Sequence, residues 1–222
     1  MGETISITSS DGFEFDAYRA LPGGDPKGAI LVIQEIFGVN PHIREVADGY
    51  ASQGYAAIAP AIFDRVEKGV ELSYDDDGMQ RGIEIAFSGL DMANTLQDLA
   101  ATAAALKSYG KVGAVGYCFG GLLAYLSACQ LDDLTCSVGY YGGGIVDVLD
   151  QDPKIPLMLH FGELDAHIPM SDVDQIKAAK PDVPVYTYAA DHGFNCNHRG
   201  SYNEAASLLA LERTLAFFGT HL

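Results

Sequence analysis

Short apolar segments that alternate with helical segments constrain the fold of this chain more than any other feature. The first apolar run, at residues 28–33 (GAILVI), is followed by a helical pattern at 42–53, where Asn40 suits the N-cap and Pro41 the first helical position. The alternation continues, with further strands predicted at 55–59, 111–117, 137–141, 157–161 and 183–188 and further helices at 95–107, 119–129, 171–179 and 202–218. Buried strands that alternate with helices predict an α/β fold, a three-layer sandwich around a mostly parallel central sheet.

The N-terminal segment has a different pattern. Residues 4–8 and 13–20 alternate between apolar and polar side chains around the turn Ser10-Asp11-Gly12, which predicts an antiparallel hairpin at a sheet edge. The polar stretch 64–80 is expected to be a surface excursion. The chain has 222 residues and no linker-like stretch, so one domain spanning 1–222 is expected.

The net charge of the chain limits the classes of partner that it can bind. A formal net charge of −17 repels nucleic acid backbones and anionic membrane surfaces, so neither is expected as a partner. The segment MGETISITSS has no features of an export signal, and no apolar run is long enough to cross a bilayer, so we expect a cytoplasmic protein. The four cysteines are then expected to be free thiols.

One cysteine occupies a position that suits a nucleophile. Cys118 in Gly116-Tyr117-Cys118-Phe119-Gly120-Gly121 directly follows a predicted strand and precedes a predicted helix, as does the serine of a G-x-S-x-G nucleophile elbow. A helix N-terminus favours the thiolate form and offers backbone N–H groups to an oxyanion. We expect the N–H groups of Phe119 and Ile36 to be those donors.

An acid and a histidine follow Cys118 in the order that such a site requires. Asp165 comes after the strand at 157–161, and His192 comes after the strand at 183–188. An imidazole can transfer a proton near neutral pH, and a carboxylate on its other nitrogen fixes its orientation. Glu163 and Asp191 are also acidic and close in sequence, so they remain alternatives to Asp165.

Two further groups could act on the thiol of Cys118. Glu35 follows the strand at 28–33, so its carboxylate is expected beside the elbow, where it could accept the thiol proton or hold the histidine away. Alternatively, His192, Cys196 and His198 have the spacing of metal ligands, and Cys118 could complete a tetrahedral set. No paired C-x-x-C supports that second interpretation, so we expect no metal.

The motifs QEIFGVN (34–40), GYCFGG (116–121), GYYGGG (139–144), GELDAHIP (162–169) and DHGF (191–194) together resemble the dienelactone hydrolase (carboxymethylenebutenolidase) family of α/β-hydrolases. The resemblance covers essentially the whole chain. It implies an ester hydrolase without a cofactor that opens 4-carboxymethylenebut-2-en-4-olide to maleylacetate in the degradation of chlorinated catechols.

The resemblance also assigns roles to individual residues. It implies a Cys118–Asp165–His192 triad, a Glu35 that pairs with the resting thiol, oxyanion donors at Ile36 and Phe119, and aromatic positions near the site at Tyr140 and Tyr141. The family holds the substrate carboxylate with arginines, a role that Arg81 matches. The second such arginine is Cys196 here, and Arg199 is the nearest replacement.

Other functions remain open beside this hypothesis. A related esterase or lactonase could act on another small carboxylate-bearing ester. A non-catalytic relative could bind a small acid without turnover, and a redox sensor could use Cys118 with Cys196 as its resolving thiol. The sequence leaves the oligomeric state open.

Overall fold

The computed structural model describes residues 2–222 and places their strands in one sheet. The strand order is β1-β2-β4-β3-β5-β6-β7-β8, with β1 and β2 antiparallel and the rest of the sheet, from β4 to β8, parallel. The strands are β1 (Glu3–Thr8), β2 (Glu14–Ala20), β3 (Ala29–Ile33), β4 (Ala56–Pro60), β5 (Val112–Tyr117), β6 (Cys136–Tyr140), β7 (Leu157–Gly162) and β8 (Val185–Tyr188). The predicted edge hairpin and parallel sheet are therefore confirmed.

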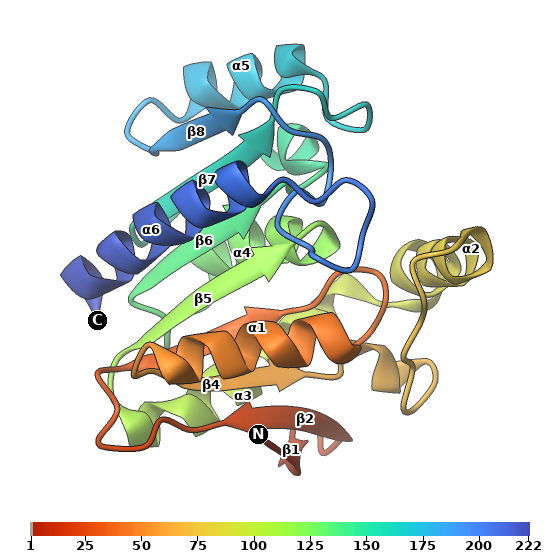
Figure 1. The fold of residues 1–222 in the computed structure, drawn as a ribbon. Coiled ribbons are helices and arrows are strands. Elements are labelled where there is room, and N and C mark those ends of the chain that lie inside the picture. Colours follow the sequence, from red (N-terminus) through yellow and green to blue (C-terminus); the bar gives the residue numbers. More distant parts are fainter. Residues whose placement is uncertain (1) are drawn as a thin grey trace.

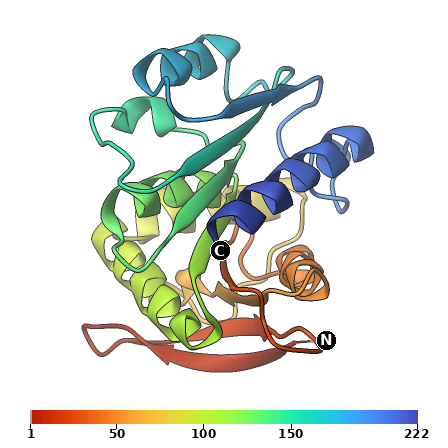
Figure 2. The same ribbon diagram turned by 90° about the vertical axis from the view of Figure 1, so that its left-hand side faces the viewer.

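Helices cover both faces of this sheet. They are α1 (Pro41–Ser52), α2 (Asp76–Glu84), α3 (Met92–Leu106), α4 (Phe119–Gln130), α5 (Met170–Ala179) and α6 (Glu204–His221). In Figure 1, α1 and α6 lie in front of the sheet, and Figure 2 shows α3, α4 and α5 on the opposite side. This is the three-layer α/β sandwich that the sequence predicted.

Apolar side chains pack between the sheet and the helices on both of its faces. Strands β3 to β7 are buried at every position, because helices cover both of their faces. Tyr50 of α1 and Phe218 of α6 belong to one apolar cluster, whereas Leu99 of α3 and Leu123 of α4 belong to a second. No helix among residues 2–222 combines the length and the apolar character that crossing a membrane requires.

The stretch 64–80 contains structure that the sequence did not indicate to us. A 3₁₀ turn, η1 (Ile62–Arg65), precedes it, and α2 begins within it. Asp75 caps α2 by accepting a hydrogen bond from the Gly78 N–H at 2.8 Å, and acidic residues in the first turn suit the helix dipole. The helix projects from the body of the molecule, as Figure 1 shows, and continues into a π-helical turn, η2 (Ile85–Gly89).

The strand order brings separate loops to one edge of the sheet. After β3 the chain moves outward to β4 and then returns to form β5 on the other side of β3. Ile33, the last residue of β3, pairs with Gly116 near the end of β5. The loops after β3 and β5 therefore meet at a topological switch point, where open α/β sheets bind ligands.

Candidate active site

Cys118 occupies a sharp turn between β5 and α4. Its backbone lies in a left-handed conformation with φ 55°, which is rare for a residue with a side chain. A Cβ added to Gly116 would lie 1.8 Å from the Gly120 carbonyl oxygen, and one added to Gly120 would lie 2.4 Å from the Ile33 carbonyl oxygen. The predicted arrangement of strand, cysteine and helix is confirmed, and both glycines are required by close backbone contacts.

His192 connects Cys118 to Asp165. Its Nε2 lies 3.1 Å from the Cys118 Sγ, and its Nδ1 lies 2.7 Å from the Asp165 Oδ2. The other oxygen of Asp165 accepts hydrogen bonds from the backbone N–H groups of His167 and Ile168, which fix the carboxylate in place.

The two alternative acids have other partners. Glu163 accepts a hydrogen bond from the Thr187 hydroxyl at 2.8 Å, and Asp191 accepts one from the backbone N–H of His192 at 2.6 Å. Of the three acids, Asp165 is therefore the one whose carboxylate contacts the imidazole ring.

Burial and hydrogen bonding oppose each other at this pair. Burial disfavours the imidazolium, but hydrogen bonds from His192 to Asp165 and Cys118 outweigh it and raise the pKa of His192 from 6.5 to about 10. Burial likewise raises the pKa of Asp165, yet His192 and the two backbone N–H groups bring it below its ordinary value. An imidazolium at this position would stabilise a thiolate on Cys118 by charge.

Two residues of the Cys118 pocket have backbone N–H groups that remain available. Within residues 2–222, neither Ile36 N–H nor Phe119 N–H donates to a backbone carbonyl, and both residues line the same pocket as Cys118. Phe119 is the first residue of α4, so its N–H has no acceptor inside the helix. The positions match those expected of oxyanion donors.

Glu35 is fully buried and does not pair with the thiol. Its Oε2 accepts a hydrogen bond from the Tyr74 hydroxyl at 2.7 Å, and its Oε1 lies 3.6 Å from the Arg199 Nη1. The Cys118 thiol contacts His192 instead. The resemblance implied a resting state in which the thiol pairs with Glu35. The structure instead shows the thiol in contact with the His192 imidazole.

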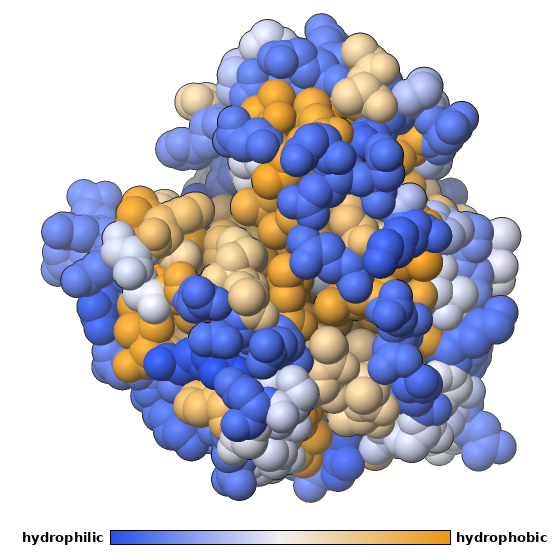
Figure 3. Space-filling model, turned by 180° about the vertical axis from the view of Figure 1, so that it is seen from behind, coloured by the Kyte–Doolittle hydropathy of each residue, from blue (hydrophilic) through white to orange (hydrophobic). Residues whose placement is uncertain are grey.

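The pocket above Cys118 is lined mainly by apolar side chains. It has a volume of about 450 Å³, and its apolar wall includes residues of α2, η2 and α4, namely Met79, Ile83, Phe87, Phe119 and Leu122. Charged side chains contribute only Arg199 and Asp147 to the lining, beside the imidazoles of His167 and His192. Figure 3, which views the molecule from behind, shows apolar side chains gathered around a hollow on this face.

The two candidate arginines have different positions. Arg81 is outside the residues that line the pocket, since its guanidinium pairs with Glu67 and Glu84, each at 2.6 Å, on the surface of α2. The structure therefore does not support Arg81 as a carboxylate ligand. Arg199 does line the pocket, and it packs against Gly193, where a Cβ would lie 2.7 Å from its Nη1.

The two tyrosines expected near the site, Tyr140 and Tyr141, also have different positions. Tyr141 lies beneath the catalytic centre, with its ring centroid 5.2 Å from that of His192. The Tyr140 hydroxyl lies 2.7 Å from the Thr214 hydroxyl, and the side chain is in the core under α6. Tyr140 is therefore a core residue behind the site and does not line the pocket.

Sequence reasoning missed Tyr74 and His167. Tyr74 lies in the polar stretch and reaches back to Glu35, whereas the His167 ring lies 5.3 Å from the His192 ring. His167 was visible in the GELDAHIP motif, but Tyr74 had no local signal, because only the folding of the stretch 64–80 over the sheet edge brings it there.

The metal set considered from spacing is not assembled. His192 pairs with Asp165 and Cys118, whereas the His198 Nε2 pairs with the Glu45 Oε2 at 2.8 Å. Cys196 instead lies near Glu35 and His42. Each of the four cysteines is a free thiol, as expected.

This fold and site define a class of protein, the hydrolases of the α/β-hydrolase fold, here with a cysteine at the nucleophile elbow. Comparison with known proteins gives the family, since the family model described as "Dienelactone hydrolase family" matches residues 15–222. The chain belongs to the dienelactone hydrolase family, and it is an ester hydrolase.

Individual relatives agree with this assignment. A carboxymethylenebutenolidase from Pseudomonas putida is 36% identical, covering 97% of this chain and 95% of the relative. Carboxymethylenebutenolidase 1 from Cupriavidus pinatubonensis is 31% identical with the same coverage of 97% and 95%. A solved Klebsiella pneumoniae chain with a provisional dienelactone hydrolase name has a TM-score of 0.84 at 29% identity and covers 98% of this chain and 99% of that one.

Proposed function

We propose that this protein hydrolyses a small enol-lactone or activated ester through a thioester on Cys118. The observation that carries the proposal is the continuous contact from Cys118 to His192 and from His192 to Asp165, at 3.1 and 2.7 Å. A nucleophile, a base and a group that orients the base are the components of covalent acyl transfer.

The reaction follows from this geometry. The Cys118 thiolate attacks the carbonyl carbon, and the oxyanion accepts hydrogen bonds from the N–H groups of Ile36 and Phe119. The ring C–O bond breaks, and the enolate leaves with a proton from His192. Water, deprotonated by His192, then attacks the thioester carbonyl; the C–S bond breaks, which releases the acid and restores the Cys118 thiolate. An enolate is a better leaving group than an alkoxide, which suits a thiolate nucleophile.

The pocket favours a small, largely apolar substrate that carries one anionic group. Its wall is apolar, and it presents the Arg199 guanidinium beside the imidazole of His192. A carboxylate on Arg199 would compete with Glu35, whose Oε1 lies 3.6 Å from the same guanidinium. The dienelactone 4-carboxymethylenebut-2-en-4-olide fits this description, and the names of the relatives support it. A neutral aryl ester is the second candidate, because the apolar lining suits an aromatic ring.

Turnover of these two substrates tests the nucleophile. We expect wild type to consume dienelactone, and Cys118→Ala to lose at least about 10³-fold in kcat, because the covalent path is removed while the oxyanion donors remain. Absorbance of each substrate gives the rates, and Cys129→Ala, a buried thiol remote from the pocket, is the matched control. Equal rates in wild type and Cys118→Ala would overturn the mechanism. Turnover of the aryl ester but not of dienelactone would keep the mechanism and show that dienelactone is not the substrate.

A pair of arginine variants tests the substrate carboxylate. Arg199→Met should raise KM for dienelactone about 10–100-fold, which corresponds to the roughly 1.5–3 kcal/mol of a hydrogen bond to a charged group. Arg81→Met should leave KM within about twofold, because its guanidinium is engaged on the surface. Steady-state kinetics with the neutral aryl ester, which has no carboxylate, shows whether either substitution damages the active site in general. An increase in KM confined to Arg81→Met would contradict the assignment of Arg199.

A further inference from the structure

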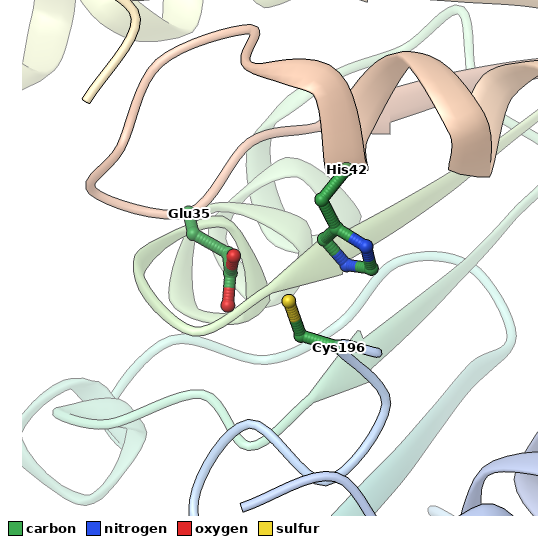
Figure 4. Close-up of side chains that lie close together, drawn as sticks. All are labelled: Glu35, His42 and Cys196. Atoms are coloured by element: carbon green, nitrogen blue, oxygen red, sulfur yellow. The ribbon is translucent and has the colours of Figure 1, made fainter. Parts of the chain in front are cut away.

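Three buried side chains converge behind the proposed active site without a structural explanation. Glu35 comes from the loop after β3, His42 from α1 and Cys196 from the loop that precedes α6. One ligand atom from each lies within 4.8 Å of the others, and the relative exposure of the three residues is 0%, 3% and 0%. Figure 4 shows the carboxylate, the imidazole and the thiol directed toward one another.

Hydrogen bonding within residues 2–222 accounts for only part of this cluster, since Tyr74 donates to the Oε2 of Glu35. Both ring nitrogens of His42 are buried and have no hydrogen-bond partner, and neither has the Oε1 of Glu35. A buried polar atom without a partner costs roughly 1–3 kcal/mol. The two ring nitrogens of His42 therefore call for a ligand, and the Oε1 of Glu35 has only the Arg199 Nη1, 3.6 Å away. A neutral imidazole offers a metal ion the lone pair of one of these ring nitrogens.

We propose that Glu35, His42 and Cys196 bind a borderline-soft divalent cation of the Zn²⁺ type. Nitrogen, sulfur and carboxylate oxygen are the donors that Zn²⁺ takes, at about 2.0–2.3 Å in tetrahedral geometry. Tetrahedral ligands at those distances lie about 3.3–3.8 Å apart, so small side-chain rotations would close the present separations. The fourth position would be filled by water or by a neighbouring oxygen.

The charge of the cluster fits such an ion. As the metal binds, the Cys196 S–H bond breaks, its proton goes to solvent and a sulfur–metal bond forms. The carboxylate and the thiolate then neutralise the two positive charges, which a buried site requires. Arg199 lies 3.6 Å from the Glu35 Oε1 and opposes the cation, but a carboxylate has lone pairs enough to serve both.

The cluster borders a surface cavity on the side of His42. His42 lines a surface cavity of about 370 Å³ together with Glu45 and Asn197. Glu45 and His198 are exposed and lie within metal-ligand range of the same His42. This outer group of imidazoles and carboxylate could receive the ion from solvent, and the inner group with its thiolate would hold it, because soft thiolate ligands favour Zn²⁺.

Binding of Co²⁺ to metal-stripped protein without substrate tests the proposal independently of hydrolysis. Co²⁺ replaces Zn²⁺ in tetrahedral sites and shows a sulfur-to-metal charge-transfer band when a thiolate is a ligand. We expect one Co²⁺ per chain with that band in wild type, and Zn²⁺ should displace it. Cys118→Ala should keep the band, because the nucleophile is outside the proposed set. Cys196→Ala should lose the band and weaken binding by at least about 100-fold, more than the loss of an outer partner costs.

Two other variants make the assignment specific. His42→Gln should weaken binding, whereas His198→Gln should leave the thiolate band in place. Absence of a thiolate band in wild type would overturn the proposal whatever the variants do. A band lost in Cys118→Ala but kept in Cys196→Ala would place the metal on the nucleophile. Binding without a thiolate band that is abolished by His198→Gln would assign it to the outer group instead, and either result would refute the inner site.

Discussion

His192 is the residue whose protonation links the site to the stability of the fold. The pKa of His192 in the folded protein is about 10, above its ordinary value of 6.5, because Asp165 and Cys118 hydrogen-bond to the ring despite its burial. A pKa raised by folding means that the protonated form is more stable in the folded chain. Its contribution to stability is therefore fully present below pH 6.5 and is lost as the pH rises to about 10.

This linkage gives a prediction for the free energy of unfolding. The difference between wild type and His192→Gln should shrink between pH 6.5 and pH 10 by more than about 1.4 kcal/mol, the value of one pKa unit. Urea unfolding at several pH values measures it, and Leu164→Ala, which changes an exposed side chain, is the control. A difference that stays constant over this range would contradict the linkage.

At the scale of elements, the turn between β5 and α4 depends on close backbone packing against β3. A Cβ on Gly120 would lie 2.4 Å from the Ile33 carbonyl oxygen and 2.5 Å from that of Gln34. Both neighbours are backbone atoms, so the side chain could be accommodated only by moving α4 away from the sheet. The position of Cys118 therefore depends on a glycine two residues away.

Gly120→Ala should consequently destabilise the protein by about 1–3 kcal/mol or more, the usual cost of overpacking. Gly49→Ala is the matched control, because it lies in α1 with no atom within 4 Å of the added Cβ. That substitution should be neutral or stabilise by up to about 1 kcal/mol. Thermal and urea unfolding of both variants measure the difference, and equal stabilities would show that α4 has room to adjust.

At the scale of the molecule, Arg65 connects the N-terminal hairpin to the helical layer. Its guanidinium makes two contacts of 2.7 Å with Asp98 of α3 and one of 2.8 Å with Asp11 in the hairpin turn. The Arg65 guanidinium also lies over the Phe13 ring, 4.4 Å from its centroid. Because the Asp98 side chain is fully buried, this cation is its compensating charge among the described residues.

Arg65→Met should therefore cost about 3–5 kcal/mol of stability, since it leaves a buried carboxylate unpaired. Arg81→Met removes two exposed ion pairs of similar length, with Glu67 and Glu84, and should cost no more than about 1 kcal/mol. Unfolding in urea compares the two variants directly. If both substitutions have the same small effect, Asp98 has found another partner and the hairpin does not depend on Arg65.

The sequence by itself predicted the order and type of most elements, because that information is local. Apolar runs, helical spacing and the Asn40-Pro41 cap each depend on neighbouring residues, and they placed the sheet, the hairpin and α1 correctly. The turn at Cys118 was visible for the same reason, since the glycines that permit it lie within two residues. The stretch 64–80 was the exception, because its capped helix α2 is short and mostly polar, with Met79 and Ile83 as its large apolar side chains.

Contacts between distant segments were decided only by the tertiary structure. The sequence favoured Asp165 as the acid but left Glu163 and Asp191 as alternatives, and the path of the loop after β7 places the Asp165 carboxylate against the imidazole. Arg81 and Arg199 were both candidates, but α2 points the first outward, and Gly193 leaves room for the second in the pocket. The side chains of Tyr74 and His42 reach Glu35 from separate segments. Such contacts depend on how strands are ordered in the sheet and how loops fold over its edge, and no local pattern encodes either.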